Sequence, residues 1–392
     1  MKRSIFNFAF VRCITVLLVT LATLACTAFA QDSSGVTCLA RTLHSWDRAN
    51  GVAIEGNYAY VATGITGLRI VNVGNPSSPQ EVGFCDTPGD ASGVAISGDY
   101  AYVADGDRGL RIVNVNNPAS PHEIGFYDTL GEVFDVAVSN GYAYVADGSH
   151  GLQIINVNNP SSPQPVGFFD TPGTARDIVV AGNYAYIADD SCGLRIVNVS
   201  NPANPQGVGF YTTLGRAYGV ALSGNYAYIA DMDTGLFIVN IRNPASPQLA
   251  GFYCATAGWP YDVVVSGSYA FLADGSGLMI LNISNPSSPQ TVGFYDSPNW
   301  AVDVAVFGGY AYVVDDIYGL RIVNVGNPSS PQETGFYDTP GFVSDVSVVG
   351  NYAYIASVDY GLRIMNISNP ANPLQVGRYA TPAGCAQGIA VS

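Results

Sequence analysis

Short apolar stretches recur along the chain, and clusters of turn-forming residues separate them. One such stretch is Tyr142–Ala146, which alternates large and small side chains, and the next is Leu152–Val157. Asn140-Gly141 precedes the first stretch, and Asp147–Gly151 lies between the two. The stretches are rich in Val, Ile and Tyr, and no segment keeps a helical period. The pattern therefore predicts short antiparallel strands joined by tight turns, without a helical domain.

A glycine followed by leucine marks a repeat with a period of 42 residues. In the third copy, four strands fit into one period: Val136–Ser139, Tyr142–Ala146, Leu152–Val157 and Gln164–Phe169. A unit of this size with four antiparallel strands is typical of a β-propeller blade, whereas a β-helix coil or a leucine-rich repeat is shorter. The marker glycines are Gly67, Gly109, Gly151, Gly193, Gly235, Gly277, Gly319 and Gly361. We therefore predict an all-β propeller with the first strand of each unit nearest the axis.

The number of blades follows from the number of complete units. Eight units run from about Gly51 to Pro382. Val36–Trp46 aligns with a fourth strand, and Gly388–Ser392 aligns with a first strand. Residues 31–392 are thus expected to form eight 42-residue repeats with a partial strand at each end. Eight blades is the prediction, and seven or nine stay open as alternatives.

The third strand of each unit carries a resemblance to a known family. Leu68–Asn72, with the sequence Leu-Arg-Ile-Val-Asn, and its seven copies resemble the LVIVD repeat of bacterial and archaeal cell-surface and secreted proteins. The resemblance implies a four-stranded propeller blade and an extracellular or cell-surface location, but no established reaction. The closing Asp of the family repeat is Asn here, which excludes a carboxylate site at that position. The eight residues are Asn72, Asn114, Asn156, Asn198, Asn240, Asn282, Asn324 and Asn366.

The first thirty residues have the features of an export signal. Basic residues precede an apolar run from Cys13 to Ala25, and Ala28-Phe29-Ala30 supplies small residues for cleavage before Gln31. The run is short for a transmembrane helix, so none is expected in the mature chain. Cys26 raises a lipid anchor as the less favoured alternative, because Thr23 stands where lipoprotein signals usually carry Leu.

The chain is acidic, with 15 basic and 30 acidic residues and a net charge of −15. That charge argues against nucleic acid and anionic membrane surfaces as partners. An extracellular protein or glycan is the expected partner. Arginines recur on the third strand, where we expect them to pair with acids at the surface: Arg69, Arg111, Arg195, Arg321 and Arg363.

Comparison of the eight copies separates constant turns from variable loops. The turn between strands three and four barely changes, as in Asn75–Pro79 and Asn327–Pro331. The loop before strand one and the loop between strands two and three both vary, and alternating strand directions place them at the same end of each blade. Loops on a rigid scaffold are where binding usually resides.

Aromatic residues gather in the variable loops of blades five to eight. They are Tyr218, Trp259, Tyr261, Trp300, Tyr318, Phe342 and Tyr360. Exposed aromatic side chains often dominate binding surfaces, so we predict that these seven recognise a glycan or a protein segment. The competing interpretation is that they fold inward and plug the mouth of the channel.

Aspartates recur at two positions near the variable end. One set ends strand two: Asp105, Asp147, Asp189, Asp231, Asp274 and Asp315. The other begins strand one: Asp135, Asp177, Asp262, Asp303 and Asp345. Turn formation is the favoured explanation for Asp before Gly, with Ca²⁺ binding by the first set as an alternative. No cofactor is otherwise expected.

Catalysis by an extracellular hydrolase or lyase is the alternative to a non-catalytic binding scaffold. Paired carboxylates are able to carry out acid–base chemistry. The three histidines, His44, His122 and His150, match no metal-site or catalytic-triad spacing, and no catalytic residue is identified. The sequence therefore favours the binding scaffold.

Overall fold

A computed structural model describes residues 51–72, 80–255, 258–315, 319–337, 343–357 and 361–379. In these ranges the chain forms strands only, and it holds no helix able to span a membrane. The predicted export signal, Cys26 and both predicted terminal strands, Val36–Trp46 and Gly388–Ser392, lie outside the described residues.

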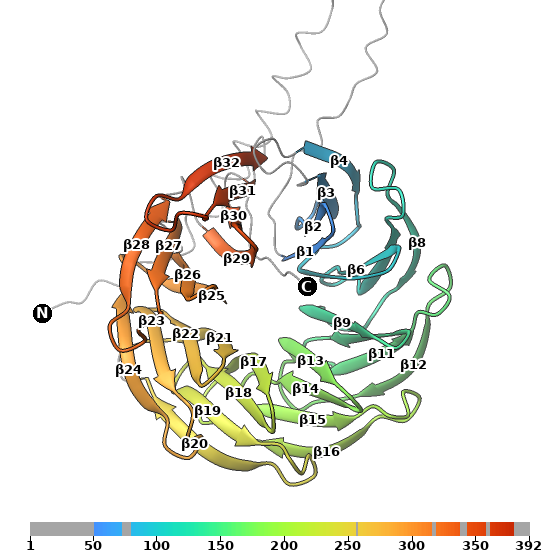
Figure 1. The fold of residues 1–392 in the computed structure, drawn as a ribbon. Coiled ribbons are helices and arrows are strands. Elements are labelled where there is room, and N and C mark those ends of the chain that lie inside the picture. The colour runs from blue at the N-terminus through green and yellow to red at the C-terminus, as the bar shows by residue number, and fades with distance from the viewer. Residues whose placement is uncertain are drawn as a thin grey trace, which may run out of the picture. The chain divides into compact units, whose positions relative to one another are not determined.

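The strands form eight four-stranded antiparallel sheets, each with its strands in sequence order. These sheets are the blades of an eight-bladed β-propeller, which confirms the predicted fold and blade number (Figure 1). We number the blades one to eight in chain order, from β1–β4 to β29–β32. The first strand of each blade is the innermost one, as predicted.

The inner two strands of the blades are short and follow the predicted boundaries closely. The first strands are β1 (Gly51–Glu55), β5 (Gly93–Ser97), β9 (Asp135–Ser139), β13 (Asp177–Ala181), β17 (Ala217–Ser223), β21 (Pro260–Ser266), β25 (Ala301–Phe307) and β29 (Val343–Val349). The second strands are β2 (Tyr58–Ala62), β6 (Tyr100–Ala104), β10 (Tyr142–Ala146), β14 (Tyr184–Ala188), β18 (Tyr226–Asp231), β22 (Tyr269–Asp274), β26 (Tyr310–Asp315) and β30 (Tyr352–Ser357).

The outer two strands complete each sheet. The third strands are β3 (Leu68–Asn72), β7 (Leu110–Asn114), β11 (Leu152–Asn156), β15 (Leu194–Asn198), β19 (Gly235–Asn240), β23 (Gly277–Asn282), β27 (Gly319–Asn324) and β31 (Gly361–Asn366). The fourth strands are β4 (Gln80–Cys85), β8 (His122–Tyr127), β12 (Gln164–Phe169), β16 (Gln206–Tyr211), β20 (Gln248–Cys254), β24 (Gln290–Asp296), β28 (Gln332–Tyr337) and β32 (Leu374–Tyr379).

Side chains between neighbouring blades form the core, because each sheet is covered on both faces. Between blades two and three, Tyr102 and Ile112 pack with Val136, Val145 and other buried apolar residues. Tyr102 is 3% exposed, so the central tyrosine of strand two fills this interface. Burying a side chain such as that of Ile112 or Val136 contributes about 1.5–3 kcal/mol. Since one blade alone buries neither face, its stability depends on its neighbours.

The constant turns lock each blade onto the one before it. A β-bulge interrupts the pairing of β15 with β16, and Gly209 lies directly beside it in β16. A Cβ on Gly209 would overlap the carbonyl oxygen of Pro244, which belongs to the Asn-Pro-x-x-Pro turn of the next blade. Gly125 and Gly167 meet Pro160 and Pro202 in the same way. Glycine in the fourth strand is therefore required by the close approach of the neighbouring backbone.

Candidate functional site

The two variable loops of the blades do lie at one end. Gly106, in the loop after β6, forms an isolated bridge with Val133, in the loop before β9. The Val133 N–H donates to the Gly106 carbonyl at 2.9 Å. Gly148 and Ala175 repeat this bridge in the next pair of blades. Bridges of this kind join the variable loops of adjacent blades from blade one to blade five.

The aspartates that end strand two fasten these loops from inside. Asp189 accepts hydrogen bonds from Thr171 Oγ1 at 2.6 Å, from the Gly173 N–H at 3.1 Å and from Arg195 Nε at 3.2 Å. All six are buried: Asp105, Asp147, Asp189, Asp231, Asp274 and Asp315. This arrangement agrees with the structural role that the sequence favoured for them.

Burial raises the pKa of four of these aspartates: Asp105, Asp147, Asp189 and Asp274. The pKa of Asp105 is raised to about 6, because burial outweighs the hydrogen bonds from Thr87 and Gly89 and the charge of Arg111. Among the described residues, no three His, Cys, Asp or Glu side chains gather as metal ligands would. Ca²⁺ binding at the six aspartates stays a prediction, and a melting temperature that falls in chelator and recovers with Ca²⁺ would support it.

The aspartates of the inner strands connect consecutive blades through backbone hydrogen bonds. Asp177 Oδ2 accepts from the Val220 N–H of the next inner strand at 2.8 Å. Asp303 Oδ2 accepts from the Val346 N–H at 2.9 Å in the same manner. Three blades carry glycine at this position, Gly51, Gly93 and Gly219. A Cβ on Gly219 would lie 3.4 Å from Asp262 Oδ1. The inner carboxyls thus point toward the inner strand of the next blade and bind its backbone.

Four of these aspartates form two carboxyl pairs. Asp135 and Asp177 are hydrogen-bonded to each other, and so are Asp262 and Asp303. Burial and the charge of Asp135 raise the pKa of Asp177 to about 7. Burial and Asp303 raise the pKa of Asp262 well above its ordinary value. Asp177 therefore keeps its proton up to about pH 7, beside the carboxyl of Asp135. The side chain of Asp345 lies outside the described part of the chain.

A row of stacked side chains lies one residue before the inner aspartates. The Arg176 guanidinium carbon is 5.4 Å from the centroid of the Phe134 ring and 4.5 Å from that of Tyr218. The rings of Tyr218 and Tyr261 meet edge to face at 6.3 Å. Sequence comparison confined the aromatic surface to blades five to eight. The structure extends the row into blades three and four. Phe134, Arg176 and Tyr218 share one position of the repeat, and this shared position was the signal in the sequence that could have predicted the longer row.

Two tryptophans stand beside this row on the variable face. The rings of Trp259 and Trp300 meet at 5.5 Å with an angle of 69° between their planes. They are 47% and 45% exposed. We name Tyr218, Trp259, Tyr261 and Trp300 the aromatic arc. The other three predicted residues, Tyr318, Phe342 and Tyr360, lie outside the described residues.

Four of the five arginines predicted on the third strand are buried, and the expectation that they pair at the surface was wrong for them: Arg69, Arg111, Arg321 and Arg363. Arg195 is half-buried. Arg111 contacts Asp105 at 3.4 Å and Asp128 at 2.6 Å, so the pairing with acids does occur. Its guanidinium lies 4.7 Å from the centroid of the Phe126 ring. Phe126 is 51% exposed while Arg111 is 5% exposed. The phenylalanine of the outermost strand thus covers the arginine.

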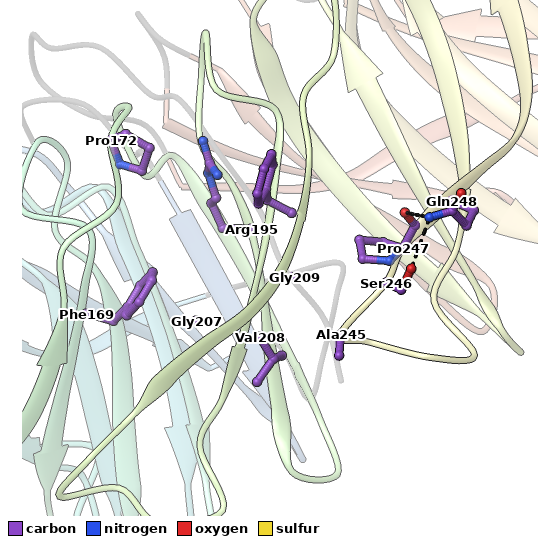
Figure 2. Close-up of a pocket in the computed structure, with 11 residues that line it drawn as sticks. Phe169, Pro172, Arg195, Gly207, Val208, Gly209, Ala245, Ser246, Pro247 and Gln248 are labelled. Atoms are coloured by element: carbon purple, nitrogen blue, oxygen red, sulfur yellow. Dashed lines mark hydrogen bonds between the residues drawn. The ribbon is translucent and has the colours of Figure 1, made fainter.

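A cavity of about 430 Å³ lies at the outer strands of blades four and five, apart from the predicted residues. Figure 2 shows Gly207–Gly209 passing between Arg195 and the turn Ala245–Gln248. Gln248 Nε2 donates to Ser246 Oγ and to the Pro247 carbonyl, which rigidifies that turn. This cavity belongs to the glycine–proline lock between blades, so we do not assign it a ligand.

Comparisons with solved structures find the same fold at low sequence identity. The computationally designed Ika8 protein superposes with a TM-score of 0.69 and 8% identity, covering 81% of this chain and 96% of that one. Saccharomyces cerevisiae Sqt1 gives 0.67 and 9% identity, with 80% and 94% covered. BamB from Moraxella catarrhalis gives 0.61 and 13% identity, with 78% and 90% covered. At such identity the likeness shows the fold alone.

The comparison with protein families is more specific. A search of curated proteins found no significant match. Eight consecutive segments match the LVIVD repeat: 48–87, 88–129, 130–171, 172–213, 214–255, 257–297, 300–339 and 340–381. Each matched segment contains the four strands of one blade, and together the segments cover most of the chain. The protein belongs to the LVIVD repeat family.

Proposed function

We propose that the protein is an exported, extracellular or cell-surface binding scaffold that recognises a glycan or a protein segment on its variable face. The observation that carries this proposal is the exposed Trp259–Trp300 pair. Large apolar side chains on a soluble surface are costly unless a partner covers them, and tryptophan is enriched among residues that dominate binding energy. The repeated blade supplies a rigid base for the loops.

The interior contacts explain why a binding role fits better than a structural plug. The side chains that hold the blades together are buried, as Tyr102 and Asp189 are. The two tryptophans contact each other but remain nearly half exposed. A plug would bury them as fully as the core tyrosines.

The test is a screen of the intact protein against a glycan array and a displayed peptide library. The double variant Trp259→Ala/Trp300→Ala should lose the ligands of the parent while its melting temperature stays the same. Phe307→Ala is the matched control, because Phe307 is also 47% exposed but ends β25 at the opposite end of its blade. A large fall in the melting temperature of the double variant, with no ligand for the parent, would show that the tryptophans are structural.

The two carboxyl pairs support a second candidate, an extracellular hydrolase or lyase. Two carboxyls that share a proton are able to act as acid and base. One carboxyl oxygen of Asp177 and one of Asp303, however, accept a hydrogen bond from a backbone N–H of the next blade. The pair also occurs twice, as a repeated structural contact would. Turnover of a polysaccharide or ester that Asp262→Asn abolishes would favour the enzyme.

A further inference from the structure

The variable face already holds a cation against an aromatic ring. Arg176 stacks on Tyr218 at 4.5 Å, and its Nε donates to Asp190 Oδ2 at 2.6 Å. A guanidinium is thus held between an aromatic face and a carboxylate. The attraction of a cation to an aromatic ring is stronger where water is excluded.

In two of the following blades, a tryptophan of the variable loop stands close in sequence to an aspartate of the inner strand. Trp259 lies three residues before Asp262, and Trp300 lies three residues before Asp303. The carboxyls of Asp262 and Asp303 form one of the two pairs on the inner strands. In the part of the chain that the structure describes, no arginine forms an ion pair with either carboxyl. Exposed aromatic rings and carboxyls of the inner strands are therefore three residues apart along the chain in both blades.

We propose that the aromatic arc binds a cationic side chain of a partner protein, on a peptide segment that carries arginine or lysine. This inference rests on the proposed binding function and specifies its ligand. The Trp259 and Trp300 planes form a corner of 69°, which offers ring surface to a compact cation from two sides. A sugar ring, in contrast, stacks on one flat aromatic face. The net charge of −15 favours the approach of a basic segment.

The experiment is calorimetric titration of the full-length protein with three probes at physiological salt. The probes are a hexa-arginine peptide, a hexa-citrulline peptide and cellohexaose. Citrulline keeps the shape of arginine but replaces the guanidinium with a neutral urea, so this pair isolates the charge. We expect hexa-arginine to bind at least about tenfold more tightly than hexa-citrulline.

Variants place that binding on the aromatic arc. Trp259→Ala/Trp300→Ala should weaken hexa-arginine binding by about tenfold or more, since both ring surfaces are lost. Asp262→Asn/Asp303→Asn removes the charge of the pair and keeps its shape, so it should also weaken binding. Asp99→Asn is the charge control, because Asp99 is exposed at the opposite end and other blades carry asparagine there, as at Asn183. Should the aspartate double variant unfold, Asp262→Asn alone replaces it.

The alternative outcomes reject either the cationic ligand or its location on the aromatic arc. Equal affinity for the arginine and citrulline peptides, or binding of cellohexaose alone, would reject the cationic ligand but leave the binding function if the tryptophans are required. Hexa-arginine binding that survives the tryptophan substitutions would be attraction to the acidic surface in general, and it would reject the site. No binding of any probe would also reject the cationic ligand, and the array and library screen would then decide the binding function separately.

Discussion

The two ends of each blade use their residues in opposite ways. At the constant end, the Asn-Pro-x-x-Pro turn places a proline carbonyl against a glycine of the preceding blade, as Pro244 does at Gly209. At the variable end, the buried aspartates are repeated, but the side chains outside them differ from blade to blade. Trp259 and Trp300 occupy loop positions that hold Glu132 and Arg216 elsewhere. The glycine–proline contact is therefore repeated because it joins neighbouring blades, whereas Trp259 and Trp300, which other blades do not share, are exposed.

The largest effect is expected where the variable end is fastened. Asp189→Ala would leave Thr171, the Gly173 N–H and Arg195 without their buried acceptor. Removing one partner from a buried, charged hydrogen-bond network costs about 3–5 kcal/mol, so the free energy of unfolding should fall by that order. Guanidinium unfolding of the parent and the variant measures the loss.

Asp170→Ala is the matched control for the Asp189 substitution. Asp170 is exposed and directly precedes Thr171. Its substitution removes an acid close to Asp189 but leaves the hydrogen bonds of Asp189 intact. Its effect should stay within about 0.5 kcal/mol. Equal effects of the two substitutions would mean that the hydrogen bonds to Asp189 do not stabilise the loops.

The next effect compares two glycines, one at each end. Gly209→Ala places a Cβ against the Pro244 carbonyl and should destabilise the propeller by about 1–3 kcal/mol through overpacking. Gly275→Ala, in the variable loop of blade six, meets nothing closer than Trp259 at 3.4 Å. It should change stability by less than about 0.5 kcal/mol. Thermal melting of the two variants side by side provides the measurement, and a reversed order would contradict the comparison of the two ends.

The sequence predicted the parts of the fold that depend on local pattern. The alternation in Tyr142–Ala146 predicted a strand, and the structure has a strand there with Tyr144 buried between blades. The 42-residue period predicted a four-stranded blade. The number of blades followed from the number of complete repeats.

Contacts between side chains of different blades were harder to predict. The pairing of Asp135 with Asp177 joins residues 42 positions apart, and nothing in one repeat shows that their carboxyls meet. The burial of Arg111 was missed because it depends on Phe126 folding over the guanidinium. Trp259 and Trp300 were assigned to variable loops from the sequence, but their mutual contact depends on the geometry of two blades.

The smallest expected effect concerns the carboxyl pairs, which lie between the two ends on the inner strands. The pKa of Asp177 is about 7 in the folded protein and about 3.9 for an aspartate in an unfolded chain. The folded protein therefore binds more protons between these values, and the resulting stability is lost as the pH rises through about 7.

Asp177→Asn should isolate this contribution, since the amide keeps an oxygen for the Val220 N–H but does not titrate near neutral pH. Asp135 is hydrogen-bonded to Asp177, and the charge of Asp177 also reaches Asp262 across Gly219. We expect the melting temperature of the parent to fall by a few degrees more than that of Asp177→Asn between pH 5 and pH 8. Asp105, whose pKa is also raised, titrates in both proteins and cancels in the difference. Asp99→Asn, exposed at the constant end, should follow the parent curve. Parallel curves for the parent and Asp177→Asn would show that the two carboxyls do not share a proton, and the inner aspartates would then act only through their backbone hydrogen bonds.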